Sequence, residues 1–326
     1  MSTINAQRFA RFAVHEDSEE DTITVRPSST ALFCIDSADR YASIQDRAVG
    51  TQSPYQFNIV KNQALLNGFF KRIALTEIVF PYYIPNINTR TDSIQVSLNG
   101  GAASTLTLVA LGFYSPAALA AELQTALITL TSVATITVGY LDGRFIINTN
   151  SADTLSFGRG NYGGLGARIN QFQLFDLLNM GPANTVASTI QITGVTRCRY
   201  TEYIDIVSSQ LTYNQKLKDA SSDKIVRDVL ARVYVETEDN LIQPYYNSTS
   251  SAEVISTNDI PGTYPFTVNR KFPLPKQIRW DDTQPLGNVS FEVYDDKGEL
   301  LTAHLGATAP DYQMPDWRFS LLVSEN

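Results

Sequence analysis

One glycine-rich run in the sequence has the spacing of a phosphate-binding loop. Gly158-Arg159-Gly160-Asn161-Tyr162-Gly163 fits the pattern G-x-G-x-x-G, in which glycines let the backbone approach a dinucleotide, and Asp176 follows at a loosely suitable distance. That pattern also needs a parallel β-α-β unit whose helix begins at the last glycine. Here Gly163-Gly164-Leu165-Gly166 continues the loop instead. We therefore interpret the run as a surface loop and expect no bound cofactor.

The sequence offers few side chains for nucleophilic or metal chemistry. Arg197 and Arg199 flank Cys198, and their charges can favour a thiolate. A cysteine or serine nucleophile also needs a nearby base, and neither of the two histidines, His15 and His304, lies in a recognisable motif. The four Cys and His residues are scattered and lack the paired close spacing of zinc ligands. We expect Cys198 to be a buried or half-buried strand residue.

Three pairs of carboxylates and two tryptophans are the remaining candidates for chemistry. The pairs are Asp36 with Asp39, Asp281 with Asp282, and Asp295 with Asp296. Close carboxylates can perform acid-base work or bind calcium, but turn and capping roles explain them more simply. Trp280 and Trp317 can stack on a sugar beside Asp281 and Asp282, although such tryptophans more often belong to a core. We assign no catalytic, cofactor-binding or metal-binding residue.

Composition limits the class of protein. The 326 residues are 43% hydrophobic and 18% charged, so the chain can bury a sizeable core and is not predominantly disordered. The net charge of −8 excludes a general basic surface for nucleic acid but leaves room for a local basic patch. Residues 1–25 carry an acidic run at Glu16, Asp17, Glu19, Glu20 and Asp21 and few large apolar side chains. This composition is typical of an acidic N-terminal arm.

No segment has the character of a signal peptide or of a membrane span. The acidic arm lacks an apolar core, and the mildly apolar stretch 116–138 contains Glu122, Gln124 and five threonines. We therefore expect synthesis in a reducing compartment, with both cysteines free and Cys34 packed in a strand.

Short runs of Val, Ile, Tyr, Phe and Thr between turn residues predict a mainly β protein. In residues 55–60, aromatic and aliphatic side chains alternate with amides, which gives the strand one apolar face. Asp295-Asp296-Lys297-Gly298 is expected to join strand 289–294 to 299–302 as a hairpin, with Gly298 at positive φ. Besides 55–60 and this hairpin, the strands predicted on either side of the middle third are 31–36, 70–80, 203–207, 229–236, 264–268, 276–280 and 317–323.

The pattern changes between Asp92 and about Val195. Strands at 93–98 and 106–109 precede a helix that Ser115 caps and Pro116 opens, with a leucine stripe on one face. The stripe consists of Leu119, Leu123, Leu127 and Leu130. A hairpin of 135–140 and 145–148 follows and packs back on that helix, and a second short helix is expected to span 170–180. We therefore expect an inserted α+β domain at 91–195, with residues 26–90 plus 196–326 forming one sandwich.

Several motifs in a fixed order carry a family resemblance. Phe33-Cys34-Ile35-Asp36-Ser37-Ala38-Asp39-Arg40 ends one strand, and Ser53-Pro54-Tyr55-Gln56-Phe57 opens the next. Residues 71–81, 84–88 and 112–115 continue the pattern, and residues 205–209, 232–235 and 295–298 continue it more loosely. In this order the motifs resemble the penton and minor capsid proteins of icosahedral double-stranded DNA viruses, of the virophage, polinton-like and giant-virus type.

The resemblance implies a viral jelly roll, an antiparallel eight-stranded sandwich, in a structural protein that is not an enzyme. Independently, the strands predicted outside the insertion number about the eight that this architecture needs. The resemblance further implies a homopentamer that closes the five-fold vertices of an icosahedral capsid beside the neighbouring major capsid protein. It places the chain in the virion, assembled inside the host cell. It makes residues 91–195 available for contact with the host surface. It implies that the chain neither binds a specific nucleic-acid sequence nor spans a membrane.

Two alternatives remain. Another minor capsid protein or a phage-type tail or baseplate subunit also combines short-stranded β domains with inserted modules. A carbohydrate-binding or carbohydrate-active β sandwich would use Trp280 and Trp317 as stacking platforms.

Overall fold

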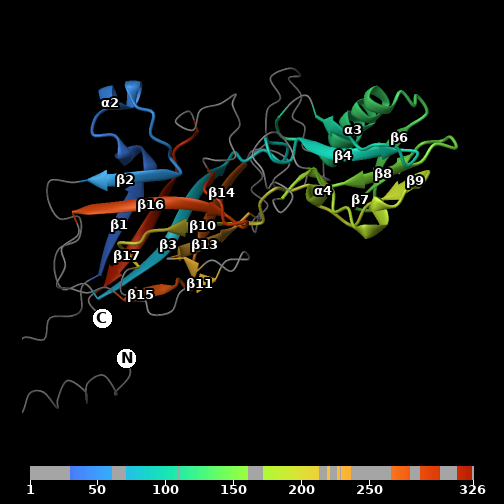
Figure 1. Cartoon of the computed structure of the whole chain (residues 1–326). Helices are drawn as coiled ribbons and strands as arrows, with labels where there is room; N and C mark the ends of the chain where they lie inside the picture. The colour runs from blue at the N-terminus through green and yellow to red at the C-terminus, as the bar shows by residue number, and fades with distance from the viewer. Residues whose placement is uncertain are drawn as a thin grey trace, which may run out of the picture.

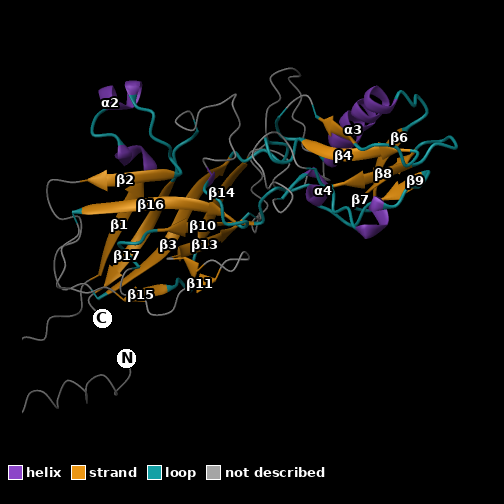
Figure 2. Ribbon diagram, in the orientation of Figure 1, coloured by secondary structure: helices purple, strands orange, loops and turns teal. Residues whose placement is uncertain are grey.

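Two groups of antiparallel sheets make up most of the chain (Figure 1). The computed structural model describes residues 30–60, 71–108, 111–160, 172–212, 219–220, 226–227, 229–235, 266–279, 287–301 and 314–324. The prediction of a mainly β protein is confirmed, as the strands that dominate Figure 2 show. Within the described ranges, no helix is both long and apolar enough to cross a bilayer.

The first sheet joins strands from both ends of the chain. Its order is β1 (Thr30–Asp36), β17 (Arg318–Ser324), β3 (Arg72–Tyr82) and β14 (Phe266–Lys271), and β15 (Gln277–Arg279) also pairs with β3. Every neighbouring pair is antiparallel, and a register shift at Ser320/Leu321 marks an irregularity between β17 and β3.

The second sheet contains four other strands of the sandwich. Its order is β13 (Val229–Tyr234), β10 (Tyr203–Val207), β16 (Asn288–Asp295) and β2 (Gln56–Val60), again all antiparallel. In β2, Phe57 and Ile59 are buried while Gln56 and Asn58 are exposed, as the alternation predicts. A short pair, β11 (Asp219–Ala220) and β12 (Val226–Arg227), lies outside both sheets.

The inward side chains of the two sheets form one hydrophobic core. Trp317 lies near its middle and contacts Phe57, Phe80 and Phe319, with ring centroids 5.2 to 5.7 Å apart. Two antiparallel sheets with these four-strand orders, the first carrying β15 as an additional strand on β3, constitute a jelly roll, so the predicted fold is confirmed.

The chain between β3 and β10 builds a second set of elements (Figure 1). One three-stranded sheet has the order β5 (Ser104–Thr107), β4 (Ser93–Leu98) and β8 (Leu155–Gly158), and another has β6 (Thr137–Leu141), β7 (Arg144–Asn148) and β9 (Ile190–Ile192). Helices α3 (Pro116–Thr131) and α4 (Leu174–Leu177) and the 3-10 helix η3 (Pro182–Thr185) complete the set. A separate hydrophobic cluster, formed by residues from Ile87 to Cys198, holds these elements together.

Helix α3 begins and packs as its sequence predicts. Ser115 Oγ accepts from the N–H of Ala118 (3.2 Å), and Leu119, Leu123 and Leu127 are buried. Leu130, the last leucine of the stripe, is 37% exposed, so the buried part of the stripe ends at Leu127. Leu130 lies one residue before the helix ends, where Ser132 turns the chain through a left-handed conformation (φ 60°).

Two further predictions need correction, and several short elements were not predicted. The second arm of the 299–302 hairpin is reduced to a bridge between Tyr294 and Leu300, because Leu301 turns into the core, although Gly298 has the expected positive φ of 88°. The helix within 170–180 shrinks to α4, and residues 170 and 171 lie outside the described ranges. Strands β8 and β9 and two helical turns, η1 (Ser37–Arg40) and α2 (Ile44–Val49), went unpredicted because each is shorter than the windows in which periodicity is visible.

Candidate functional site

The Asp36–Arg40 motif builds a buried polar corner where β1 ends. Asp36 Oδ1 accepts from the N–H of Ala38 (2.8 Å) and caps η1. The buried guanidinium of Arg40 donates to the carbonyl oxygens of Ser37 (2.6 Å) and Gln52 (3.1 Å). The first half of the motif therefore holds the turn from β1 towards β2.

Asp316, just before β17, completes the corner. Its carboxylate accepts from Arg40 and from Ser37 Oγ (3.0 Å), and Ser37 Oγ in turn accepts from the N–H of Trp317 (2.9 Å). The indole N–H of Trp317 donates to the carbonyl oxygen of Pro54 (2.6 Å) at the start of β2. The motif that carries the family resemblance thus joins three strands and performs a structural task.

The carboxylate candidates that the structure describes have turn and capping roles, as expected. Asp295 Oδ1 accepts from the N–H groups of Lys297 (3.0 Å) and Glu299 (2.7 Å). Asp296 pairs with Lys297 at 2.6 Å, and burial raises the pKa of the Asp296 carboxyl. Other candidates lie outside the described residues, namely Trp280, Asp281, Asp282, His15 and His304.

Cys198 is buried, but it does not lie in a strand. It has a positive φ of 52°, and burial raises the pKa of its thiol to about 12, which opposes thiolate chemistry. Arg199 donates to the carbonyl oxygen of Val235 (2.5 Å) and pairs with Glu202. Cys34 does lie in β1, yet its side chain is exposed, so its predicted packing is wrong. Both cysteines are free, as predicted.

The glycine run does not form a phosphate loop in its described part. Gly158 ends β8, which is antiparallel to β4, whereas a dinucleotide fold needs a parallel crossover. The N–H of Gly160 donates to Gln173 Oε1 (3.1 Å), so the buried Gln173 already satisfies this backbone donor. Arg159 pairs with Asp176. Residues 161–163 lie outside the described ranges.

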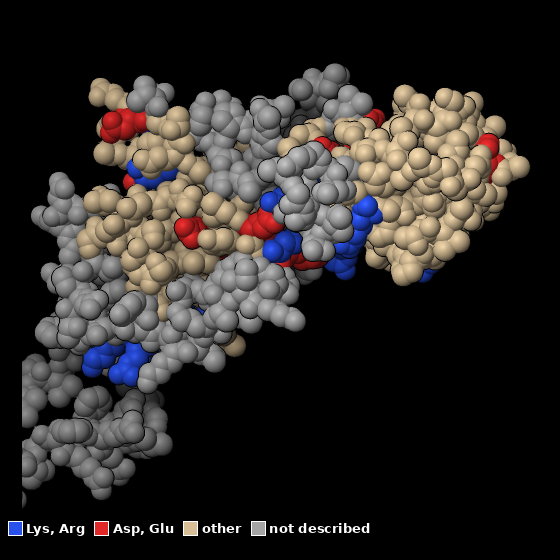
Figure 3. All heavy atoms as spheres, viewed as in Figure 1, with Lys and Arg blue, Asp and Glu red and all other residues tan. Residues whose placement is uncertain are grey.

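A polar junction lies where the second set of elements leaves and rejoins the sandwich. Asn86, fully buried, donates to the carbonyl oxygens of Tyr114 and Cys198 (both 2.8 Å) and accepts from the N–H of Tyr114 (2.8 Å). Lys297 Nζ lies 4.3 and 4.5 Å from the ring centroids of Phe172 and Tyr200. Figure 3 shows blue and red atoms together in this region. The junction binds the outgoing segment to the returning one.

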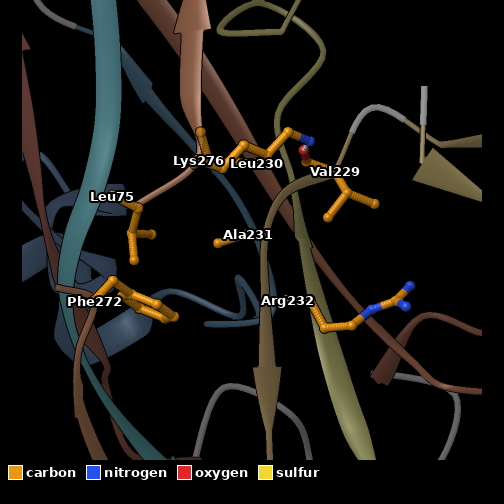
Figure 4. Close-up of a pocket in the computed structure, with 7 residues that line it drawn as sticks. All are labelled: Leu75, Val229, Leu230, Ala231, Arg232, Phe272 and Lys276. Atoms are coloured by element: carbon orange, nitrogen blue, oxygen red, sulfur yellow. Dashed lines mark hydrogen bonds between the residues drawn. The ribbon is translucent and has the colours of Figure 1, made fainter. Parts of the chain in front are cut away.

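One cavity of about 300 Å³ lies between β3 and β13 (Figure 4). Its cations are already engaged, because Lys276 Nζ donates to the carbonyl oxygen of Val229 (2.8 Å) and Arg232 makes a two-point pair with Asp205 (2.7 and 2.8 Å). The complete lining is Leu75, Val229, Leu230, Ala231, Arg232, Phe272 and Lys276. None of these side chains is a carboxylate, a thiol or a hydroxyl.

The described ranges also contain no group of three or more His, Cys, Asp or Glu side chains arranged to hold a metal ion. The polar clusters described above hold turns, helix caps and the segment junction together, and the outer surfaces of the described ranges are further candidates for function.

The chain is similar in structure to a penton protein. One match is the crystal structure of the selenomethionine-labelled mavirus penton protein, with a TM-score of 0.47 and 11% sequence identity. It covers 91% of this chain and 99% of that chain. No protein-family model matches the sequence, and no curated protein matches it significantly.

Sequence reasoning missed the role of Asn86 at the junction. The signal is an amide within the apolar run Ile84-Pro85-Asn86-Ile87, since a buried amide must find partners for its donors. It also missed a row of exposed cations on the first sheet, because Arg72 and Arg279 are adjacent only through the pairing of β3 with β15.

Proposed function

We propose that this chain is a structural virion protein, the penton that closes the five-fold vertices of an icosahedral capsid as a homopentamer. The observation that carries the proposal is the strand order β1-β17-β3-β14 opposite β13-β10-β16-β2. This jelly-roll order is used by viral capsid domains. The motif resemblance from Asp36 to Phe57 supports the same assignment.

We assign residues 26–90 plus 196–326 to the jelly-roll domain and residues 91–195 to the inserted domain. The support is the division of the buried apolar side chains into two clusters, one within the sandwich and one running from Ile87 to Cys198. The inserted domain leaves the sandwich after β3 and returns before β10, so it extends the molecule without interrupting a sheet.

A ring of five copies needs two different complementary flanks on each subunit, because contacts around a cyclic axis are heterologous. The neighbouring major capsid protein then surrounds the ring in the virion, where the protein serves assembly rather than catalysis. We assign assembly to the interior of the host cell.

The inserted domain is the part we assign to host-surface contact. Residues 91–195 contain eight charged side chains and no lysine, and Figure 3 shows few blue or red atoms over the part that carries α3. Exposed apolar side chains lie there instead, among them Leu141, Val186, Ile190, Ile192 and Val195. Contacts made by such a surface depend little on ionic strength.

Native mass spectrometry of the purified full-length chain tests the proposal. We expect a species of five chains, and deletion of residues 91–195 with a short linker should leave that number unchanged because the sandwich supplies the ring contacts. A trimer or hexamer would favour the tail or baseplate alternative, and a stable monomer at micromolar concentration would contradict the penton assignment.

A further inference from the structure

We propose that residues 16–25 of this chain dock on the outer face of its own first sheet, across β1, β17, β3 and β15. The acidic run binds a row of exposed cations there, and the apolar residues that follow the run cover two exposed leucines. This inference concerns the jelly roll alone and does not depend on the penton assignment.

The cation row is produced by strand pairing. Thr30 of β1 is opposite Ser324 of β17, Ser324 is opposite Arg72 of β3, and Arg72 is opposite Arg279 of β15. Arg72 and Arg279 are exposed on the outer face, since the neighbouring Ile73 and Ile278 enter the core. Figure 3 shows Lys and Arg atoms gathered at the end of the sandwich near β15.

Like charges directly opposite each other on a sheet are destabilising unless an anion lies between them. Lys71, also exposed, precedes Arg72 and adds a third positive charge, with its N–H bonded to Ser324 O (2.9 Å). Within the described ranges, no carboxylate forms an ion pair with any of the three. Arg72 Nη1 donates to the neutral Gln277 Oε1 (3.0 Å). The row therefore has the chemistry to bind a carboxylate-rich segment.

An apolar row lies beside the cations on the same outer face. Leu32 of β1 is opposite Leu322 of β17, and these side chains are 62% and 37% exposed. Thr30 is the first residue of the edge strand β1, and both leucines are closer to it than Arg279 is. A segment that crosses the sheet from Thr30 thus meets leucines first and cations second.

In the sequence before Thr30, the apolar residues are likewise nearer to Thr30 than the acidic residues are. Reading back from Thr30, a linker of residues 26–29 that includes Arg26 comes first, Val25 and Ile23 follow, and the acidic run comes last, at Asp21, Glu20, Glu19, Asp17 and Glu16. Strands lie about 4.8 Å apart, so Arg72 and Arg279 are about 10 and 14 Å from Thr30. The eight residues between Asp21 and Thr30 span up to about 27 Å when extended, which is ample.

Attachment in the same chain favours this occupant over a free polyanion. A short tether holds the acidic run at a millimolar effective concentration near the row. The cation row is at the surface, so its attraction for an anion is screened by salt. Docking is therefore expected at low ionic strength and is weakened at about 0.5 M salt.

Zero-length carbodiimide coupling on the full-length protein tests the contact. The reagent joins Lys71 Nζ to a carboxylate only where the two touch, and peptide mass spectrometry identifies the partner. We expect Lys71 to be coupled to a carboxylate of residues 16–21, in products that have the mass of a single chain. This cross-link should be absent in Lys71→Ala and present in Lys271→Ala. Coupling found only in two-chain products would overturn the proposal in favour of a neighbour's segment. Coupling only to Asp281 or Asp282 would overturn it in favour of local neutralisation.

Cleavage by a glutamate-specific protease at Glu19 and Glu20 gives a second readout. We expect Arg279→Glu to raise the cleavage rate about five-fold at low salt, to the rate that the wild type shows at high salt. Arg144→Glu is the matched control, because Arg144 is an exposed strand arginine outside the jelly roll, and it should change nothing. Equal cleavage rates in the wild type, Arg279→Glu and Arg144→Glu would refute the proposal. It would also be refuted if Arg279 were needed to bind DNA or anionic vesicles while residues 16–25 were not protected from cleavage. Thermal melting verifies that the variants are folded.

Discussion

The side-chain amide of Asn86 donates to the carbonyl oxygen of Cys198 at 2.8 Å and so joins two segments that are 112 positions apart. Asn86 belongs to the segment that leaves the sandwich after β3, and Cys198 belongs to the segment that returns to β10. The same amide also bonds Tyr114, just before α3. One buried side chain therefore positions the exit, the return and the main helix of the inserted region.

Asn86→Ala should lower the free energy of unfolding by about 3 kcal/mol, because buried backbone groups of Tyr114 and Cys198 lose their partners. Urea unfolding followed by circular dichroism measures the change. Asn269→Ala, at an exposed position of β14, is the control and should change stability by less than about 0.5 kcal/mol. Equal losses in the two variants would show that the junction carries no special weight.

Asp316 accepts from two arginines that differ in burial. The Arg40 side chain is 2% exposed and the Arg47 side chain 57% exposed. Asp316→Asn should cost about 3 kcal/mol because it leaves the Arg40 charge buried without its anion, whereas Arg47→Ala should cost less than about 1 kcal/mol. Thermal unfolding of both variants measures the difference. A loss in Arg47→Ala as large as in Asp316→Asn would contradict this account of the corner.

Leu123→Asp should unfold the inserted region, because it places an unpaired charge in the second hydrophobic cluster. Limited proteolysis should then cut within 91–195 at least ten-fold faster. Ala121→Asp lies on the exposed face of α3 and serves as the control. If melting and proteolysis are unchanged in Leu123→Asp, the buried face of the helix is assigned wrongly.

Stability should fall at alkaline pH. Burial raises the pKa of the Cys198 thiol from its ordinary value of 9.0 to about 12, and burial also raises the pKa values of the Tyr82 and Tyr200 hydroxyls. Because the unfolded chain releases these protons at lower pH, stability is complete below about pH 9 and decreases towards pH 12, by about 1.4 kcal/mol per pH unit for each group. Urea midpoints between pH 8 and 10.5 measure the slope. Cys198→Ala should flatten it between pH 9 and 10, and an identical slope would contradict the role of Cys198.

The two cysteines should differ in reactivity towards a thiol reagent such as dithionitrobenzoate. Cys34 is exposed on β1 and Cys198 is fully buried, so one thiol per chain should react in the native protein and two in urea. Native Cys34→Ser should react slowly or not at all. Two fast thiols in the native wild type would be incompatible with the buried position of Cys198.

The strands and the main helix were predictable because their signals are local. Alternation in residues 55–60 and the Ser115-Pro116 start of α3 each determine backbone geometry within a few residues. The Asp142-Gly143 turn between β6 and β7 is another case, since both residues adopt the positive φ that a two-residue hairpin favours. The jelly-roll class followed from the number of such strands together with the order of the motifs.

Strand partners, and every site built from them, required the tertiary structure. Arg72 and Arg279 lie opposite each other although 207 residues separate them, and Arg40 meets Asp316 across 276 residues. Short elements such as β9 depend on their neighbours for stability, so three residues of sequence carry too little pattern to reveal them. Hydrophobic alternation selects which face of a strand is buried, whereas the packing of two sheets around Trp317 selects which distant side chains share a surface.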